Sequence, residues 1–287
     1  MSYQTLIALR YLRAKRRQRT VSLNTLISIA GVTLGVAALI ATLAVMSGFE
    51  ENLREKILGT TAHIVIVDRA QRPIERYDEV MKAVAPLPHV VAAAPFIFNQ
   101  VLLTAGSNVH GVVLRGIDPA AEGAVTDVER NLIDGRLADL TTAFPPPADK
   151  PELSPRYGII IGKELALRLG VFTGDTLNVV SPQGTMGPFG VVPKLRPYQV
   201  AGIFESGMYD YDSSFAYISL AQAQDFFQLG DAVTGIEIKV DDIFRAGDVA
   251  SAADAALGGR YLVRDWKEMN RNLFSALKLE KIIMFII

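Results

Sequence analysis

The segment 158–164 has the residue types of a phosphate-binding loop, because two glycines and a lysine lie between an apolar run and a helix-forming stretch. A nucleotide-binding loop of this kind needs four residues between its glycines and a Ser or Thr after the lysine to hold magnesium. Here three residues separate Gly158 from Gly162, and Lys163 is followed by Glu164, a carboxylate that would repel phosphate. The segment is therefore predicted to be a strand, a turn and a helix start without a nucleotide.

The remaining residues that could do chemistry form no recognisable site. His63, His89 and His110 are scattered, without the H-E-x-x-H spacing of a zinc site, and no G-x-S-x-G nucleophile motif occurs. Asp210 and Asp212 alternate with tyrosines, but the loop of a calcium site is missing, so a solvated acidic turn is expected. The chain also has no cysteine. We therefore expect no catalytic residue, no metal, no cofactor and no enzymatic activity of the chain itself.

The amino-terminal residues predict a membrane anchor. Residues 1–20 carry six basic and no acidic side chains, and the uncharged, largely apolar run that follows predicts a transmembrane helix over 21–48. An excess of Lys and Arg beside a span holds that end in the cytoplasm. A cleaved signal peptide has an apolar core of only about 7–15 residues, shorter than this run. We therefore expect a retained anchor with a cytoplasmic amino end and the bulk of the chain on the other side.

The carboxyl end predicts the start of a second membrane helix over 276–287. It finishes in six apolar residues, 282–287, which at about 1.5 Å per residue cannot cross a bilayer. We interpret them as the first turns of a helix that has been cut. The part of the chain after residue 20 is acidic, since a net charge of −1 for the whole chain and +6 for residues 1–20 leave −7. This charge argues against nucleic acid as a partner.

The patterns over 49–275 predict an α+β domain. Apolar runs and alternating segments predict strands, segments with a helical period predict helices, and Ser219 and Asp265 each begin a capping box. A hairpin is expected across the turn at Gly106. The strands are predicted at 63–67, 96–103, 109–117, 158–161, 175–180, 198–204, 215–218, 236–240 and 261–263. The helices are predicted at 77–85, 163–169, 219–228, 242–257 and from 265 to the end.

A long Gly- and Pro-rich stretch, 181–197, separates two of these strands. Connections between strands usually have about 2–5 residues, and longer ones are commonly functional or disordered. Met186, Phe189 and Val192 are apolar side chains in this stretch without an obvious core to bury them, which is typical of a partner-binding surface. A second Pro-rich stretch, 144–151, is expected to be a surface loop or a linker.

Several short motifs, taken as a set, resemble the lipoprotein-releasing permeases of the LolC/LolE type, which belong to the MacB-like ABC-transporter permeases. They occur in the family's order over essentially the whole chain. The motifs are LRYLR at 9–13, SIAGVTLGV at 28–36, VMSGFE at 45–50, RGIDP at 115–119, IGKELA at 161–166 with LG at 169–170 and GD at 174–175, and LEK at 279–281.

The resemblance implies four membrane helices and a large periplasmic domain between the first two. That domain consists of a porter-like subdomain, here expected at 49–117 and 232–275, and an inserted second subdomain, here expected at 118–231. Helices two to four of the family, and the cytoplasmic segment that contacts the ATPase, have no counterpart among these residues. We therefore expect a chain that is truncated and not competent for transport by itself.

The resemblance also implies the function. It predicts a permease subunit in the bacterial inner membrane that extracts lipoproteins from that membrane and passes them to a periplasmic carrier protein. ATP hydrolysis would belong to a separate ABC ATPase subunit, and the other partners would be a second permease, the lipoprotein substrate and membrane lipids. The second permease could make a homodimer or a LolC/LolE-type heterodimer; the LolE-like segment 209–217 favours one type serving both roles.

Three groups of site residues follow from this resemblance and from helical spacing. The carrier is expected to dock on a β-hairpin hook, 185–196, which matches by position and by its Thr-Met-Gly and Pro-x-x-Arg elements. Its residues are Thr185, Met186, Pro188, Phe189, Val192, Pro193, Lys194 and Arg196, of which Arg196 is expected to make a charge-assisted contact. One face of the first helix is expected to line an acyl-chain cavity or, alternatively, to pack on another helix or face lipid: Leu39, Leu43, Met46 and Phe49. Gly31 and Gly35 would allow another helix to approach closely.

Two other functions remain open. One is a related MacB-like export permease for peptides or small amphiphiles, although an efflux pump of the MacB kind would carry its ATPase domain ahead of the first helix, where this chain has residues 1–20. The other is a binding or sensor domain tethered by a single span, which leaves the apolar end at 282–287 without an explanation.

Overall fold

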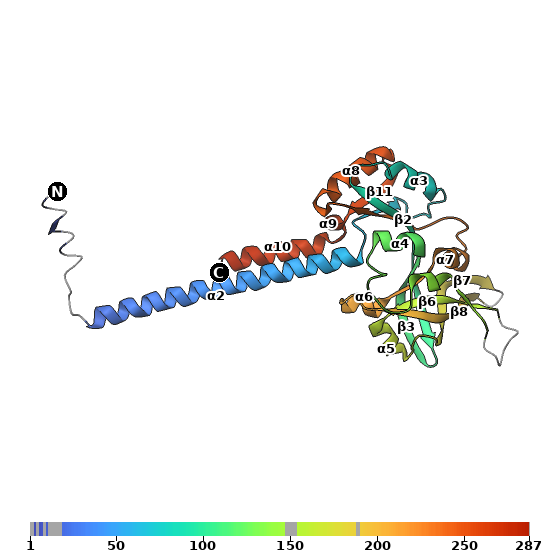
Figure 1. Cartoon of the computed structure of the whole chain (residues 1–287), viewed down its shortest axis with the longest axis horizontal. Helices are drawn as coiled ribbons and strands as arrows, with labels where there is room; N and C mark the ends of the chain where they lie inside the picture. The colour runs from blue at the N-terminus through green and yellow to red at the C-terminus, as the bar shows by residue number, and fades with distance from the viewer. Residues whose placement is uncertain are drawn as a thin grey trace. The chain divides into compact units, whose positions relative to one another are not determined.

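The computed structural model describes residues 3, 6, 7, 10, 19–146, 154–187 and 190–286 (Figure 1). Two compact units make up the chain. The helical unit consists of Met1–Asn52 and Leu277–Ile287, and the α+β unit consists of Leu53–Ala276. The predicted architecture, an apolar amino-terminal helix followed by an α+β domain, is confirmed.

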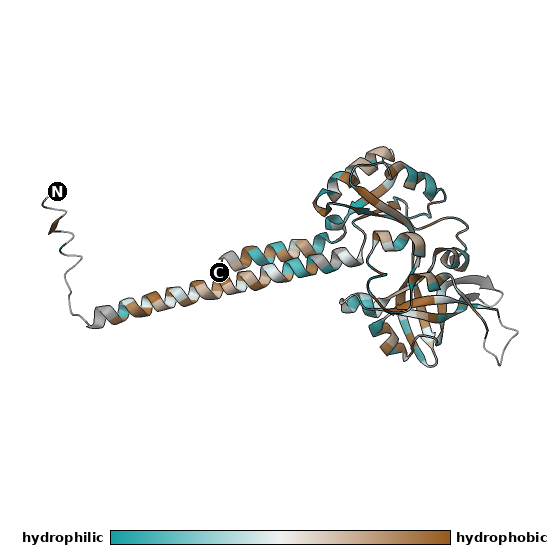
Figure 2. Ribbon diagram, viewed as in Figure 1, coloured by the Kyte–Doolittle hydropathy of each residue, from teal (hydrophilic) through white to brown (hydrophobic). Residues whose placement is uncertain are grey.

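The longest element is helix α2, Arg19–Thr60, which runs through the predicted span and its polar continuation without a break. Its stretch Leu23–Arg54 is long and apolar enough to cross a membrane, and among the described residues it is the one helix that meets this criterion. Apolar residues follow one another along most of it (Figure 2), and Leu26, Val32 and Leu34 are all exposed. A helix that is apolar on all sides needs lipid or another chain to cover it.

The helix predicted from Asp265 to the end of the chain is two helices. Helix α9, Trp266–Met269, begins where the Asp265 carboxylate accepts a hydrogen bond from the Glu268 amide at 2.7 Å, as the capping pattern predicts. It ends at Asn270, whose side-chain amide donates to the carbonyl at the start of α9 at 2.8 Å, and helix α10, Arg271–Ile286, follows. The prediction of one continuous helix is therefore wrong at Asn270, where this local hydrogen bond competes with helical pairing.

One layer of the α+β unit is a four-stranded antiparallel sheet with the order β11-β1-β10-β2. The chain order β1-α3-β2 and β10-α8-β11 makes it a ferredoxin-like βαββαβ arrangement, whose middle connection, from β2 to β10, contains the rest of the unit. Helices α3 and α8 cover one face of this layer (Figure 1). The bounds are β1 Ile64–Asp68, α3 Tyr77–Val84, β2 Val90–Ala105, β10 Gly235–Val240, α8 Ala246–Ala256, preceded by the 3-10 turn η2 Ile243–Arg245, and β11 Tyr261–Asp265.

The second half of β2 leaves this layer and enters a closed ring of six strands. β2 pairs with β3 across the predicted turn at Gly106, β3 with β9, β9 with β6, β6 with β8, and β8 with β7, which returns to β2 at 102–104. Closing a sheet on itself removes the unpaired edges that could join other strands. The bounds are β3 Asn108–Ile117, β6 Arg156–Gly162, α5 Lys163–Leu169, β7 Thr176–Gly187, β8 Gly190–Phe204, β9 Phe215–Ser219 and α7 Leu220–Phe227.

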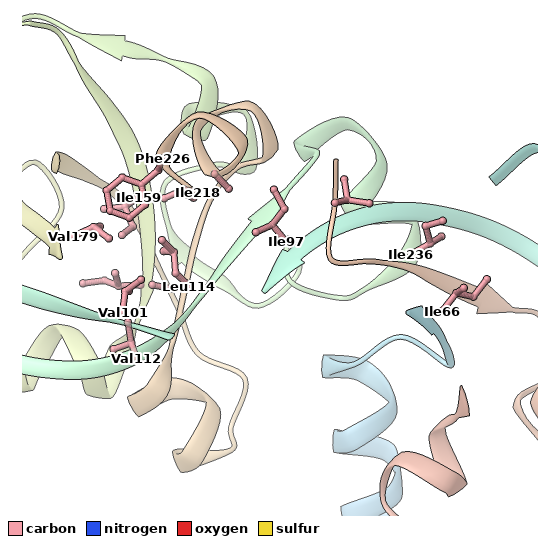
Figure 3. Close-up of a cluster of buried hydrophobic side chains, with 14 of the residues drawn as sticks. Ile66, Ile97, Val101, Val112, Leu114, Ile159, Val179, Ile218, Phe226 and Ile236 are labelled. Atoms are coloured by element: carbon pink, nitrogen blue, oxygen red, sulfur yellow. The ribbon is translucent and has the colours of Figure 1, made fainter. Parts of the chain in front are cut away.

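One continuous apolar core joins the layer to the ring, because β2, at 16 residues, is long enough to serve both. Figure 3 shows Ile66 and Ile236 of the layer at one end, Ile97 of β2 between, and Val101 and Leu114 of the ring at the other end. All are buried. Since β3 pairs within the ring, we propose that the boundary between the porter-like and inserted subdomains lies near Ile97 and not after residue 117.

Several short elements around the ring were not predicted, because they are too short for a periodic signal. Strand β4 pairs with β8, and β5 pairs with β6. Most of the Pro-rich stretch predicted as a loop or linker, 147–151, lies outside the described residues. The additional elements are α4 Pro119–Val125, β4 Leu132–Asp134, the 3-10 helix η1 Leu137–Thr141, β5 Ala143–Phe144 and α6 Tyr209–Ser214.

Candidate functional site

The predicted hook lies at the end of the hairpin formed by β7 and β8. Strand pairing continues from Thr176, opposite Gln199, out to Gly187, opposite Gly190, with an irregularity between Ser181 and Thr185. The Gly- and Pro-rich stretch is therefore a pair of strands and not an irregular loop. Pairing satisfies the backbone groups of a segment that leaves the core, which explains how so many residues can extend from the ring.

The stem of this hairpin is held against helix α7. Arg196 donates to the Asp225 carboxylate at 2.5 Å and to the Gln222 side chain at 3.2 Å, and Lys194 donates to the Asp225 carbonyl at 3.2 Å. The Arg196 and Lys194 cations also lie 5.6 and 5.5 Å from the centre of the Phe226 ring. The hydrogen bond from Arg196 lowers the pKa of Asp225. Arg196 and Lys194 therefore hold the stem of the hairpin against α7.

The other predicted hook residues are described to different extents. Pro188 and Phe189 lie outside the described residues, and for Thr185, Met186 and Val192 the structure describes the backbone but not the side chain. Pro193 is exposed on β8. The placement of the hook therefore rests on the strand register and on the stem.

The residues predicted for an acyl-chain cavity lie on α2 in the helical unit. Leu43 and Met46 are half-buried, whereas Leu39 and Phe49 are 44% and 55% exposed. Glu50, one turn beyond Met46, lies 3.8 Å from Lys281 of α10.

The predicted small-residue face of α2 is open in this chain. A Cβ added at Gly31 or Gly35 would meet nothing within 4 Å. Both positions are therefore accessible to another helix.

A buried cluster of ionisable groups was missed by the sequence analysis. Arg115 on β3 donates to Glu237 on β10 at 2.7 Å, and its guanidinium lies 3.9 Å from Glu122 on α4. Burial raises the pKa of Glu122 to about 7, against the attraction of Arg115, and the Thr126 hydroxyl donates to Glu122 at 2.9 Å. Arg115 also lies 5.4 Å from the centre of the Phe96 ring. The position of the charged Arg115 directly after the apolar run 112–114 was the available signal.

The prediction of a solvated acidic turn is wrong for Asp212. This side chain is 4% exposed and accepts hydrogen bonds from the backbone amide and the hydroxyl of Ser206, at 2.8 and 2.7 Å. Asp210, on the other side of α6, is exposed. Among the described residues no group of three or more His, Cys, Asp or Glu side chains is placed to hold a metal ion.

The glycines of 158–164 have a packing role. A Cβ at Gly158 would collide with the Asp139 carbonyl, and a Cβ at Gly162 with the backbone of Asp212. Lys163 donates to Glu205 at 2.8 Å, which neutralises the cation that a phosphate would need.

The histidines have local partners. The Nδ1 atom of His63 accepts from the Val240 amide at 3.2 Å, and burial lowers the pKa of this ring. His89 lies 2.9 Å from Asp241, and His110 lies 2.7 Å from Arg168. The three rings thus belong to three separate hydrogen-bonded contacts.

Comparisons with known proteins identify relatives over nearly the whole chain. The family model described as the MacB-like periplasmic core domain matches residues 25–256. The lipoprotein-releasing system transmembrane protein LolC of Xylella fastidiosa is 38% identical over 98% of this chain and 64% of its own length. LolC of Neisseria meningitidis is 35% identical over 100% of this chain and 66% of its own length. The periplasmic region of MacB from Actinobacillus actinomycetemcomitans aligns at 14% identity and a TM-score of 0.47, covering 78% of this chain and 96% of that one.

Proposed function

The chain belongs to the family of proteins with the MacB-like periplasmic core domain, and on that premise we propose that it is a permease subunit of a lipoprotein-releasing ABC transporter. It would extract lipoproteins from the inner membrane and pass them to a periplasmic carrier. The observation that carries this proposal is the 38% identity to a LolC protein over 98% of the chain. The chain spans 64% of that relative's length, so the activity of the whole protein is part of the proposal.

The proposal gives each unit a role. Helix α2 crosses the inner membrane with residues 1–20 in the cytoplasm, and the α+β unit lies in the periplasm. Leu39, Leu43, Met46 and Phe49 contact the acyl chains of the lipoprotein, and Gly31 and Gly35 face the helix of a second permease, in a homodimer or a LolC/LolE-type heterodimer. A separate ABC ATPase subunit hydrolyses ATP.

The hook, 185–196, is the proposed docking site of the carrier. Its supports are the paired strands of β7 and β8 and the contacts of Arg196 and Lys194 with α7. A hairpin fixed at its stem loses less conformational freedom on binding than a free loop, which strengthens the complex. Arg196 therefore acts through the orientation of the hairpin, in addition to the carrier contact predicted for it.

Replacing 185–192, the end of the hairpin beyond Lys194 and Arg196, by an Asn-Gly turn tests this docking site. Because Lys194 and Arg196 stay paired with β7, and β7 stays paired with β2, the full chain should stay folded, as circular dichroism would report. Capture of the purified carrier by the immobilised chain should be lost. The matched control is Phe172→Ala, which removes an aromatic side chain that is 73% exposed on a different loop. Undiminished capture by the shortened hairpin would refute the assignment.

A further inference from the structure

A cavity of about 240 Å³ lies within the α+β unit, on the outer face of β2, β3 and β9. One wall consists of Thr61 and Ala62, the residues that directly follow α2, and another consists of Met269 and Asn270, the residues that directly precede α10. By chain connectivity, the cavity therefore adjoins the end of α2 and the start of α10, both of which belong to the α+β unit.

The remaining walls are mainly aromatic. Phe96, Phe98 and Phe215 line the cavity, and Tyr211 stacks on Phe215 with ring centres 4.7 Å apart. Phe98 is 42% exposed although it neighbours a well-packed core. Exposed aromatic surface that lines a concavity is typical of a site that binds an apolar ligand.

The polar end of the cavity is an ion pair with a spare donor. Arg115 and Glu237 both line the cavity and are joined by a hydrogen bond of 2.7 Å. The Nε–H of Arg115 is buried and has no hydrogen-bond partner among the described residues. A phosphate or carboxylate would meet the repulsion of Glu237, whereas an uncharged carbonyl oxygen can accept from a guanidinium without bringing a charge.

A second cavity continues along the same face. It has a volume of about 420 Å³ and is lined by Gln100, Leu102, Val113 and Ser214. Phe98 is opposite Arg115 and Gln100 is opposite Val113 in the β2–β3 register, so the two cavities occupy successive positions of one strand face. A long, narrow ligand can therefore extend from the first cavity toward the second.

We propose that this groove binds a fatty acyl chain, with its ester or amide carbonyl at Arg115 and its methylenes along Phe98 and Phe215. The first cavity is smaller than the roughly 300–1,000 Å³ of drug-sized sites, which suits a segment of one chain and not a whole amphiphile. The proposal rests on the proposed function, because a permease for lipoproteins handles acyl chains. It adds a site in the α+β unit, separate from the residues assigned on α2.

Fluorescence quenching by brominated acyl chains tests the proposal with the full chain in phospholipid nanodiscs. The reporter is Phe98→Trp, and the control reporter is Phe172→Trp, at an exposed aromatic position outside both cavities. Emission of the native Trp266, which is buried, is subtracted by using the unmodified chain. One arm adds a synthetic triacylated lipopeptide with brominated chains, and the other uses nanodiscs of brominated phosphatidylethanolamine.

Loss of emission from Phe98→Trp, with little loss from Phe172→Trp, would support the proposal. If the brominated lipopeptide causes this loss, the acyl chain comes from the lipoprotein; if the brominated phospholipid causes it, the chain comes from the membrane. In the lipopeptide arm, each added methylene should strengthen binding by roughly fourfold until the groove is full. Met269→Gln, a nearly isosteric polar change in the wall, should weaken quenching without unfolding the unit.

Equal quenching of both reporters, no quenching, or quenching unaffected by Met269→Gln would overturn the proposal. None of these outcomes bears on carrier capture by the hook, so the two hypotheses fail separately.

Discussion

Arg115 ties the two parts of the α+β unit together electrostatically. It lies on β3 of the ring, its main partner Glu237 lies on β10 of the layer, and Glu122 lies on α4. All three side chains are almost completely buried. Removing one partner from a buried ion pair leaves an uncompensated charge and typically costs about 3–5 kcal/mol. The arrangement of the ring on the layer therefore depends on this cluster.

Glu122→Gln should remove a pH dependence of stability. Burial raises the pKa of Glu122 from 4.5 to about 7, so the folded state holds its proton more tightly than the unfolded chain does. The protonated Glu122 side chain therefore adds to the free energy of unfolding, and this contribution is fully present below pH 4.5 and is lost as the pH rises through about 7. At pH 8 the free energy of unfolding of Glu122→Gln, measured with urea, should exceed that of the unmodified chain by on the order of 3 kcal/mol.

The matched control for this prediction is Glu129→Gln, an exposed glutamate after the same helix. It should unfold like the unmodified chain at every pH. If Glu122→Gln kept the decline in stability between pH 4.5 and 7, another group would have to titrate there.

The ion pair between Arg115 and Glu237 could not be predicted from the sequence. Arg115 and Glu237 are 122 positions apart, and neither forms a motif with its neighbours in sequence. The prediction that Asp212 is solvated was wrong for a similar reason, since the burial of this side chain depends on the Ser206 hydroxyl and on the packing of α6 over Gly162. Sequence patterns report local structure, whereas these partners are assembled by the fold.

At the scale of elements, the sequence was most informative where a pattern was regular. The alternating and apolar runs predicted β1, β6 and β10, and the caps at Ser219 and Asp265 are both present. The closure of the ring could not be predicted, because β7 returns to β2 through only 102–104. The hook became recognisable as a hairpin through family resemblance, since its glycines and prolines give no strand signal.

Asp225→Ala should weaken carrier binding without unfolding the chain. The change removes the ion pair between Asp225 of α7 and Arg196 of the stem. The Arg196 side chain is 26% exposed and the Asp225 side chain is 69% exposed. Partly exposed pairs contribute about 0–1 kcal/mol to stability, so urea unfolding should change little. Carrier affinity, measured by calorimetry, should fall several-fold because the hairpin loses its fixed orientation.

The control for the stem is Asp254→Ala, which breaks the exposed pair with Arg69 on the layer. Its carrier affinity should match that of the unmodified chain. The double variant Arg196→Ala and Asp225→Ala should lose no more carrier affinity than the single variant with the larger loss. Additive losses would instead indicate that Arg196 contacts the carrier directly and independently of Asp225.

At the scale of the whole molecule, an apolar helix that needs lipid or another chain to cover it is combined with an α+β unit whose hairpin leaves the core. The family match over 25–256 spans both features. The glycines of 158–164 serve packing. A permease that moves a lipidated protein needs a membrane helix, a site for the carrier and an external source of energy. This division of labour agrees with the proposed function.

Photo-crosslinking in living cells tests the central claim most directly. A photoreactive amino acid replaces Pro193, an exposed residue of the hook, or Phe172 as the control, in cells that also produce the partner ATPase and the carrier. Illumination should join the periplasmic lipoprotein carrier to the Pro193 position and not to the Phe172 position, as mass spectrometry of the adduct would identify. Absence of the carrier from the Pro193 adducts, or equal capture at both positions, would contradict the account.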